Sequence, residues 1–280
     1  MQTTKIKKYQ HKSFVKWIGG KTQLLPELVS RMPWNYNKYI ELFVGGGSLF
    51  FEVQPREAIL SDLCTDLIMA YQAVRDMPEL LLKSLAKHEA SYEYFQEVRS
   101  ADRDPSFSKW DTLNRASRFL YLNKTARSGM FRVNNNGQFN APYGRYKNPN
   151  IVNEEKIRYC NKVLQSASLL NSDYKDVFEC ADRGDFVYID PPYLTPLDGN
   201  KIFNEYTREK FSYEDQKLLR SIVDKLTNKG VKVMISNSYC PTIFSLYSDY
   251  LIDEVVANRA VNSDSLNRKD SVKEVIIRNY

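Results

Sequence analysis

The stretch Phe186-Val187-Tyr188-Ile189-Asp190-Pro191-Pro192-Tyr193 guides the interpretation of the whole chain. Its first four residues are β-branched or aromatic, and they predict a buried strand that ends at Ile189. The two prolines fix φ and carry no backbone N–H, so they leave carbonyl oxygens turned toward whatever lies beyond the strand. Asp190 adds a carboxylate acceptor, and Tyr193 adds a flat ring for stacking. This combination suits an exocyclic amino group on a heterocycle; a plain proline turn is the alternative.

Length and composition restrict the class of protein. The 280 residues are enough for one large domain, or for one domain with an insertion. Hydrophobic residues make up 42% of the chain, and no apolar run approaches the length of a membrane span. Residues 1–12 are polar and basic and lack the apolar core of a signal peptide. We therefore expect a soluble, cytoplasmic protein.

Cysteine, histidine and charge usage narrow the chemistry. The four cysteines are widely separated without paired spacing, which is typical of a reduced cytoplasm and unlike a zinc site. Only two histidines are present, so we expect neither a His-ligated metal nor histidine acid–base catalysis. The net charge of +6 is consistent with a polyanionic partner, and almost as well with an ordinary basic surface.

A second strand-and-turn unit lies nearer the N-terminus. Residues 39–44 (YIELFV) predict a buried strand, and Gly45-Gly46-Gly47-Ser48 follows before a short amphipathic stretch. Glycines at such a junction let the backbone turn sharply and approach a ligand closely. The next predicted strand, 58–61, leads to Asp62, placed like the acid that holds ribose hydroxyls in doubly wound sheets. With neither a G-x-G-x-x-G fingerprint nor a phosphate loop, the pattern predicts adenosine binding without phosphate chemistry; a structural turn is the alternative.

A third segment, Phe14–Lys21, precedes both units. Its Gly19-Gly20 pair comes just before a predicted helix over residues 22–30, with Lys21 at the first turn. A cation at a helix N-terminus is unfavourable against the helix dipole, so we expect an anion such as a ligand carboxylate near Lys21. A solvated lysine at a helix start is the alternative.

The predicted elements alternate between strands and helices at both ends of the chain but not in its middle. Helices are expected over 78–99, 111–124, 154–165 and 213–229, and strands over 167–170, 186–189 and 231–236. Residues 127–149 predict a hairpin or long loop, and 250–256 with 272–277 an antiparallel hairpin at the sheet edge. The fold class is therefore α/β. A mainly parallel sheet, formed by residues 1–70 and 152–280, is interrupted by a helical insertion over 71–151.

In this order the segments resemble the DNA adenine methyltransferase (Dam) family. The resemblance covers nearly the whole chain and includes, besides the segments above, Leu60-Ser61-Asp62, residues 119–123 (FLYLN), residues 137–147 (GQFNAPYGRYK), Asp173-Tyr174 and Ile235-Ser236-Asn237. It implies a Rossmann-like, S-adenosylmethionine-dependent methyltransferase sheet whose insertion recognises the DNA target. It further implies site-specific methylation of adenine N6 in double-stranded DNA, on a flipped-out base.

The resemblance also implies roles for individual residues. The implied catalytic residues are Asp190, Pro191, Pro192 and Tyr193. The implied contacts of S-adenosylmethionine are Trp17, Lys21 (methionine end), Phe43, Gly45, Gly47, Asp62 (ribose), Asp173 and Tyr174 (adenine), and Asp190. The implied DNA contacts are Lys16, Arg127, Ser128, Met130, Arg132, Pro142, Arg145, Tyr146 and Lys147. No metal is implied.

The residues before Gly129 depart from the family pattern. The family usually places an aromatic residue and an asparagine there, and the aromatic ring wedges into the duplex beside the flipped base. This chain has Arg127-Ser128 instead. Arginine can stack or fill a groove, but it is not an apolar wedge. The resemblance therefore leaves the GATC target, and the means of flipping, open.

Three interpretations remain at this point. The first is a DNA adenine-N6 methyltransferase of bacterial or phage origin, associated with the nucleoid and either solitary or paired with a cognate restriction endonuclease. The second is methylation of adenine in RNA, or of cytosine N4, although the family's cytosine enzymes usually carry serine where Asp190 stands. The third is a catalytically inactive DNA-binding protein on the same scaffold, against which the intact Asp190–Tyr193 segment and glycine loop argue.

Overall fold

The computed structural model describes residues 13–193, 211–258 and 271–280, so the expectation for residues 1–12 lies outside the described part. These residues form a seven-stranded sheet in the order β3-β2-β1-β4-β5-β7-β6. The strands are β1 (Tyr39–Glu41), β2 (Ala58–Ser61), β3 (Ala167–Leu170), β4 (Phe186–Ile189), β5 (Lys232–Ser238), β6 (Leu251–Asn258) and β7 (Ser271–Arg278). Pairing is parallel from β3 to β5, whereas β7 runs antiparallel to both β5 and β6. The mainly parallel α/β sheet and its antiparallel edge hairpin are thereby confirmed.

The strand order alone indicates where a ligand site lies in this sheet. The chain runs outward from β1 to β2 and β3, then returns to add β4 and β5 on the other side of β1. The order therefore reverses between β1 and β4. In doubly wound sheets a crevice forms at this point, beyond the carboxyl ends of the strands. The glycine loop after β1 and the Asp190 segment after β4 meet there.

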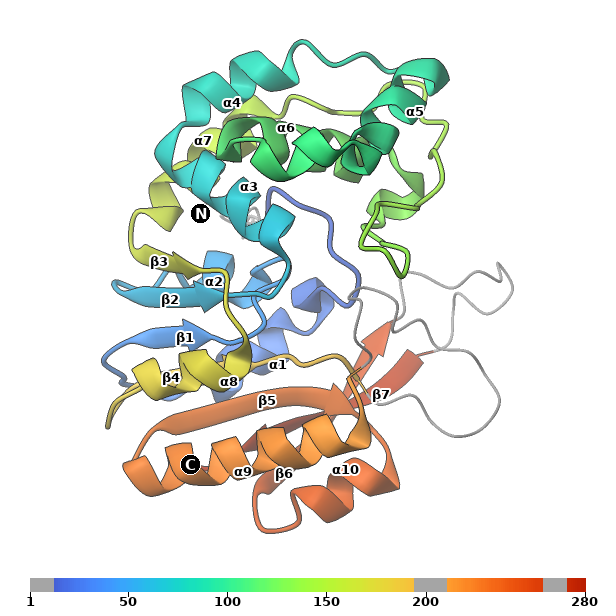
Figure 1. Cartoon of the computed structure of the whole chain (residues 1–280). Helices are drawn as coiled ribbons and strands as arrows, with labels where there is room; N and C mark the ends of the chain where they lie inside the picture. The colour runs from blue at the N-terminus through green and yellow to red at the C-terminus, as the bar shows by residue number, and fades with distance from the viewer. Residues whose placement is uncertain (1–12, 194–210, 259–270) are drawn as a thin grey trace, which may run out of the picture.

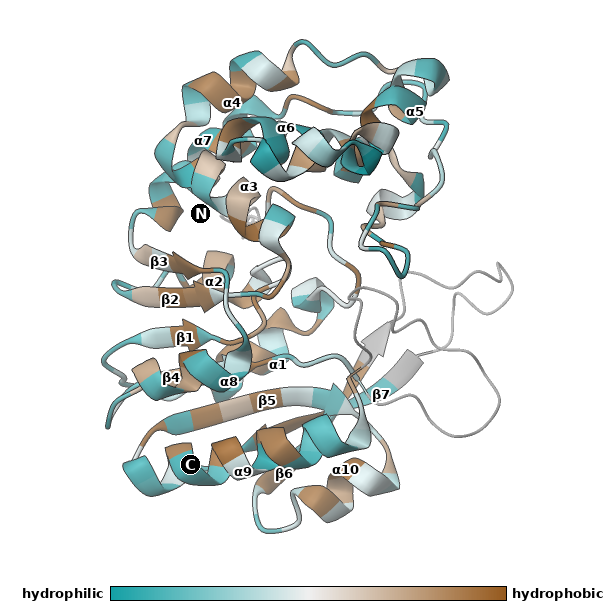
Figure 2. Cartoon of the chain, viewed as in Figure 1, coloured by the Kyte–Doolittle hydropathy of each residue, from teal (hydrophilic) through white to brown (hydrophobic). Residues whose placement is uncertain are grey.

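Helices cover both faces of the sheet because successive strand residues point to opposite sides. Tyr39, Leu60 and Tyr188 belong to one buried cluster, and Ile40 and Val187 to the other. The first face is covered by α1 (Leu25–Arg31), α2 (Ser48–Val53) and α3 (Thr65–Asp76), and the second by α8 (Tyr174–Val177), α9 (Tyr213–Lys229) and α10 (Pro241–Leu246). Figure 2 shows apolar residues along the central strands and alternating polar and apolar turns on α9.

A second group of helices lies beyond the β3 side of the sheet, at the top of Figure 1. It contains α4 (Pro78–Leu85), α5 (Tyr92–Ser100), α6 (Thr112–Thr125) and α7 (Glu154–Leu164). A buried arginine ties α6 to α5: Arg118 donates to the carbonyls of Val98 and Arg99 and pairs with Asp102 at 2.8 Å. Residues 126–143 fold back on themselves through the isolated bridges Ala126–Tyr143 and Val133–Phe139. The predicted hairpin or long loop is thus a hairpin-like loop without regular strands.

Two helix predictions need correction. The helix expected over 78–99 is divided, with α4 ending at Leu85 and α5 beginning at Tyr92. The side chain of Ser91 accepts a hydrogen bond from the backbone N–H of Tyr94 at 3.2 Å, and this cap starts a separate helix. The helix expected over 22–30 begins later, at Leu25. Residues Lys21–Gln23 form a 3-10 turn, and the proline at position 26 suits the first turn of α1.

Two general properties concern the described residues alone. Within residues 13–193, 211–258 and 271–280, no helix is long and apolar enough to cross a bilayer. Across the same residues, no group of three or more His, Cys, Asp or Glu side chains is arranged to hold a metal ion.

Candidate active site

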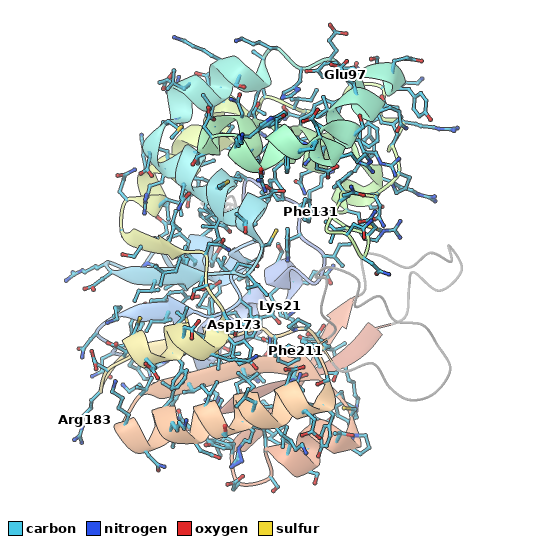
Figure 3. All side chains as sticks on the ribbon, in the orientation of Figure 1. Lys21, Glu97, Phe131, Asp173, Arg183 and Phe211 are labelled. Atoms are coloured by element: carbon cyan, nitrogen blue, oxygen red, sulfur yellow. The ribbon has the colours of Figure 1, made fainter. Side chains whose placement is uncertain are left out.

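Asp190 directly follows β4 and forms an ion pair with Lys21 across the crevice. The Lys21 Nζ atom lies 2.8 Å from Asp190 Oδ1, and it also donates to the carbonyl of Gly19 at 2.8 Å. The same ammonium lies 4.8 Å from the centre of the Tyr193 ring, a cation–π distance. The sequence predicts an anion near Lys21, and in the structure the chain's own Asp190 supplies one. Figure 3 shows Lys21 in the middle of the molecule, between the upper helices and α9.

The protonation of Asp190 depends on three neighbouring influences. Burial raises the pKa of its carboxyl to about 6, although the adjacent Lys21 ammonium opposes the shift and the Glu274 carboxylate adds to it. Glu274 reaches the site from β7, where it accepts a hydrogen bond from the Tyr193 hydroxyl at 2.6 Å. Asp190 is therefore a carboxylate at neutral pH but becomes protonated in mildly acidic solution.

Two buried amide side chains, Gln216 on α9 and Asn237 on β5, link Pro192 to the rest of the protein by hydrogen bonds. Gln216 Nε2 donates to the carbonyl of Pro192 at 3.2 Å, and Asn237 Nδ2 donates to Gln216 Oε1 at 3.2 Å. Both amide side chains are fully buried. The Pro192 carbonyl thus already has one hydrogen-bond donor within the protein. The sequence analysis did not identify Gln216. The pattern that could have indicated it is a polar residue on the face of α9 that otherwise carries the apolar Leu219 and Val223.

The glycine loop after β1 has backbone geometry that side chains would disturb. Gly45 has φ +46°, and a Cβ there would lie 2.7 Å from Trp17 Cδ1. Gly47 has φ +60°, and a Cβ there would lie 2.7 Å from the Tyr71 hydroxyl oxygen. That hydroxyl donates to the carbonyl of Gly45 at 3.1 Å. The loop therefore needs glycine both for conformation and for close packing.

Asp62, at the end of β2, holds the glycine loop in place. Its Oδ2 accepts from the backbone N–H of Gly45 at 2.9 Å, and its Oδ1 accepts from that of Cys64 at 2.9 Å. Burial raises the pKa of Asp62, and these backbone donors oppose the shift. Each oxygen keeps a further lone pair, so the carboxylate can also accept from a ligand hydroxyl.

An aromatic cluster lies between the segment that follows β1 and α8. Phe43, Tyr174 and Phe211 have ring centres 5.1 to 5.9 Å apart. Burial raises the pKa of Tyr174 to about 12, and its buried hydroxyl has no hydrogen-bond partner among the described residues. Asp173 caps α8 by accepting from the Lys175 N–H at 3.0 Å. Sequence reasoning missed Phe211, which comes from a distant part of the chain; Figure 3 shows it with Asp173 in the central region.

Glu41, at the end of β1, is a fully buried acid for which the sequence predicted no role. It accepts from the Tyr39 hydroxyl and from the backbone N–H of Phe50, the latter at 3.1 Å. Burial raises its pKa to about 8, opposed by these two donors and assisted by the nearby Asp190. Glu41 is therefore mostly neutral at pH 7 and fixes α2 next to β1.

Three of the predicted DNA contacts lie together beside the crevice. The backbone N–H of Ser128 donates to the Tyr146 hydroxyl at 2.8 Å, and Lys16 Nζ lies 5.4 Å from the centre of the Tyr146 ring. Asn123, fully buried on α6, holds these segments together. It accepts from the Lys16 N–H at 2.9 Å and donates to the carbonyls of Lys16 and Gly129 at 2.7 and 3.0 Å.

The other predicted DNA contacts are more dispersed. Arg127, Pro142, Arg145 and Lys147 are exposed, and the Arg127 N–H donates to the Pro142 carbonyl at 2.9 Å. Met130 packs partly against the core, and Arg132 Nε donates to Asn140 Oδ1 at 2.7 Å. Trp17 links the two groups of residues, because its ring stacks on Phe131 of the loop at 6.1 Å and borders Gly45 of the crevice.

Comparison with known proteins agrees with this geometry. Residues 17–261 match the family described as D12 class N6 adenine-specific DNA methyltransferase. The Type II methyltransferase M1.LlaDCHI of Lactococcus lactis subsp. cremoris is 43% identical over 271 residues, which is 95% of each chain. The Type II methyltransferase M.MjaIII of Methanocaldococcus jannaschii is 38% identical (96% of this chain, 99% of the relative), and the DNA adenine methylase of Escherichia coli 31% (93% and 92%). The chain therefore belongs to the D12 class of N6 adenine-specific DNA methyltransferases.

Proposed function

We propose that this enzyme methylates N6 of an adenine that has been flipped out of double-stranded DNA, with S-adenosylmethionine as donor and Asp190 as the main amine acceptor. The observation that carries the proposal is the position of Asp190. It is a half-buried carboxylate at the reversal of strand order, 2.8 Å from Lys21, and Lys21 in turn lies against the Tyr193 ring. A flipped base needs both a stacking face and an acceptor for its Watson–Crick edge, and Tyr193 and Asp190 supply them.

The crevice residues fit S-adenosylmethionine. The cluster of Phe43, Tyr174 and Phe211 offers flat apolar surface, and the unpartnered Tyr174 hydroxyl offers a polar atom, as an adenine ring requires. Asp62 can accept from ribose hydroxyls, and the close-packed glycine loop lets the backbone approach the ligand. When bound, the cofactor supplies a methyl group on a sulfonium, an already activated donor.

The protein's part in transfer is positioning and electrostatics. The N6 lone pair of adenine is delocalised into the ring, so the amine is a poor nucleophile. One N–H donates to the Asp190 carboxylate and the other to a backbone carbonyl near Pro191, which favours a lone pair localised on nitrogen. The Pro192 carbonyl already accepts from Gln216, so we assign this role to the preceding carbonyl. No strong base is required, because the extra proton on N6 leaves after transfer.

The Lys21–Asp190 pair predicts the pH dependence of the reaction. Asp190 accepts an N–H only as a carboxylate, so kcat/KM should fall as the pH drops through about 6, the raised pKa of Asp190. In Lys21→Met the midpoint should move to higher pH, because the lysine lowers that pKa. In Glu274→Gln it should move to lower pH, because Glu274 raises it. Steady-state pH profiles of the two variants test this, and a midpoint that neither variant moves would exclude Asp190 as the titrating group.

We propose that residues 71–151 form the target-recognition part and that the exposed Arg127 assists base flipping. In Arg127→Ala the flipped population should fall several-fold, since an exposed cationic side chain over a ring contributes about 0.5–1 kcal/mol. The fluorescence of 2-aminopurine at the target position, at saturating DNA, measures this. Arg145→Ala is the matched control, because it removes the same charge from an exposed position nearby and should weaken DNA binding without reducing the flipped fraction. Equal fluorescence in wild type and Arg127→Ala would refute the role.

Transfer from labelled S-adenosylmethionine to an unmethylated duplex tests the proposed function. We expect label in duplex DNA, and we expect RNA of the same sequence neither to accept label nor to compete. Label in RNA would favour the RNA alternative. Cofactor binding by calorimetry without transfer to either would favour an inactive DNA-binding protein.

We further propose that the enzyme acts in the cytoplasm on nucleoid DNA, either alone or with a cognate restriction endonuclease.

A further inference from the structure

A basic cavity of about 320 Å³ lies beside the cluster of Lys16, Ser128 and Tyr146. It is formed where the N-terminal segment, the end of α6, residues 146–150 and the start of α7 come together. Three lysines and three asparagines contribute to its lining: Lys16, Lys124, Lys156, Asn148, Asn150 and Asn153. None of the residues that line it is acidic. The cavity therefore gathers positive charge and amide donors from separate parts of the chain.

The three ammonium groups lack a counter-charge within the described part of the chain. None of Lys16, Lys124 and Lys156 forms an ion pair there. Lys124 donates to the carbonyl of Phe14, which leaves two of its three protons for other acceptors. Burial, then repulsion from Lys156 and Lys16, lowers the pKa of Lys124 to about 8. An anion in the cavity would relieve this repulsion.

The start of α7 adds to the positive potential. Asn153 accepts a hydrogen bond from the Lys156 N–H at 3.1 Å and so caps this eleven-residue helix, whose positive dipole end then faces the cavity. Two acids lie in the first turn, Glu154 and Glu155, and neither lines the cavity. Glu154 pairs with Arg158, one turn further along the helix, at 2.8 Å. Charge, amide donors and helix orientation therefore all favour a compact anion.

We propose that this cavity binds a phosphate of the DNA backbone beside the recognition site, with Lys124 and Lys156 as its contacts from α6 and α7. The proposal rests on the proposed function, because it requires DNA on this surface. Lys16 and Tyr146 line the cavity, and with Ser128 they also form the cluster of predicted DNA contacts. One DNA strand can therefore reach the cavity and this cluster together. The phosphate would fix the register of the duplex, whereas base contacts would specify its sequence.

The salt dependence of DNA binding tests the proposal. Each phosphate contact contributes about −0.9 to the slope of log K against log[salt], so Lys156→Gln should make the slope shallower by about one and weaken binding several-fold at about 0.1 M KCl. Lys162→Gln is the matched control, because Lys162 lies exposed on the same helix, outside the cavity, and carries the same charge. It should leave the slope unchanged. Cofactor affinity, measured by calorimetry, should be the same in both variants.

Three results would overturn the proposal. The first is an unchanged slope in Lys156→Gln, and the second is an equal change in both variants, which would show a general charge effect. The third is sub-millimolar binding of inorganic phosphate without DNA that is lost in Lys156→Gln, which would assign the cavity to a free anion. Failure of the proposed function is separate, because the wild-type enzyme would then transfer no methyl group to duplex DNA.

Discussion

Replacing Asp190 with alanine should reduce single-turnover methyl transfer about a thousandfold, the scale on which removal of one preorganised polar group at a reacting centre slows an enzyme. The carboxylate is half-buried where the strand order reverses, and no other described acid forms an ion pair with Lys21. Without it, one N–H of the adenine amine loses its acceptor and the lone pair stays delocalised. Duplex and cofactor affinities should remain within about threefold of wild type, because most binding contacts lie elsewhere.

A second variant separates the catalytic role of Asp190 from a structural one. Alanine leaves the buried Lys21 ammonium without its ion-pair partner, which is costly in itself. Asp190→Asn keeps the side-chain volume and one carbonyl acceptor, so it should fold as wild type and retain more activity than the alanine variant. If duplex affinity falls as far as the transfer rate in both variants, Asp190 is structural rather than catalytic.

Gly45→Ala should weaken S-adenosylmethionine binding by at least about thirtyfold. An L-residue in the left-handed region costs roughly 1–2 kcal/mol, and here the new Cβ would also lie 2.7 Å from Trp17. Relief of that contact must move either the loop or the indole ring, and both border the crevice. The Gly45 N–H to Asp62 bond, at 2.9 Å, would be displaced with the loop. Calorimetric titration of the cofactor measures the loss.

Gly137→Ala is the control that isolates the steric contact. Gly137 has φ +76°, but a Cβ there would have no atom within 4 Å. It imposes a similar backbone strain on a distant loop, so cofactor affinity should equal that of wild type. Equal affinity in Gly45→Ala and wild type would show that the glycine loop does not contact the cofactor.

The sheet was predictable because its signals are local. Strand residues followed at once by glycines after β1, or by an acid and prolines after β4, identify two strand ends from a few adjacent residues. An anion does lie near Lys21, but the argument from a helix start does not explain it, because Lys21 lies in a 3-10 turn and α1 begins only at Leu25. That the anion is Asp190 depends on the reversal of strand order between β1 and β4, a property of topology rather than of spacing.

The remaining features depend on contacts between distant segments. Phe211 completes the aromatic cluster with Phe43 only after α9 packs on the sheet, and Gln216 reaches Pro192 for the same reason. Asn123 looks like one polar residue in an amphipathic helix until its amide joins Lys16 to Gly129. The break between α4 and α5 was missed because helical propensity continues across it, whereas the Ser91 cap decides the boundary.

Base-by-base mapping of methylation in unmethylated genomic DNA, with wild-type enzyme and Asp190→Ala treated side by side, is the most direct measurement. The predicted result is N6-methyladenine confined to one short motif with wild type and absent with the variant. The mapped motif would also show whether Arg127-Ser128 accompanies a target other than GATC. Methyl groups on cytosine, or an equal pattern with the Asp190→Ala variant, would contradict the placement of the adenine amine at Asp190.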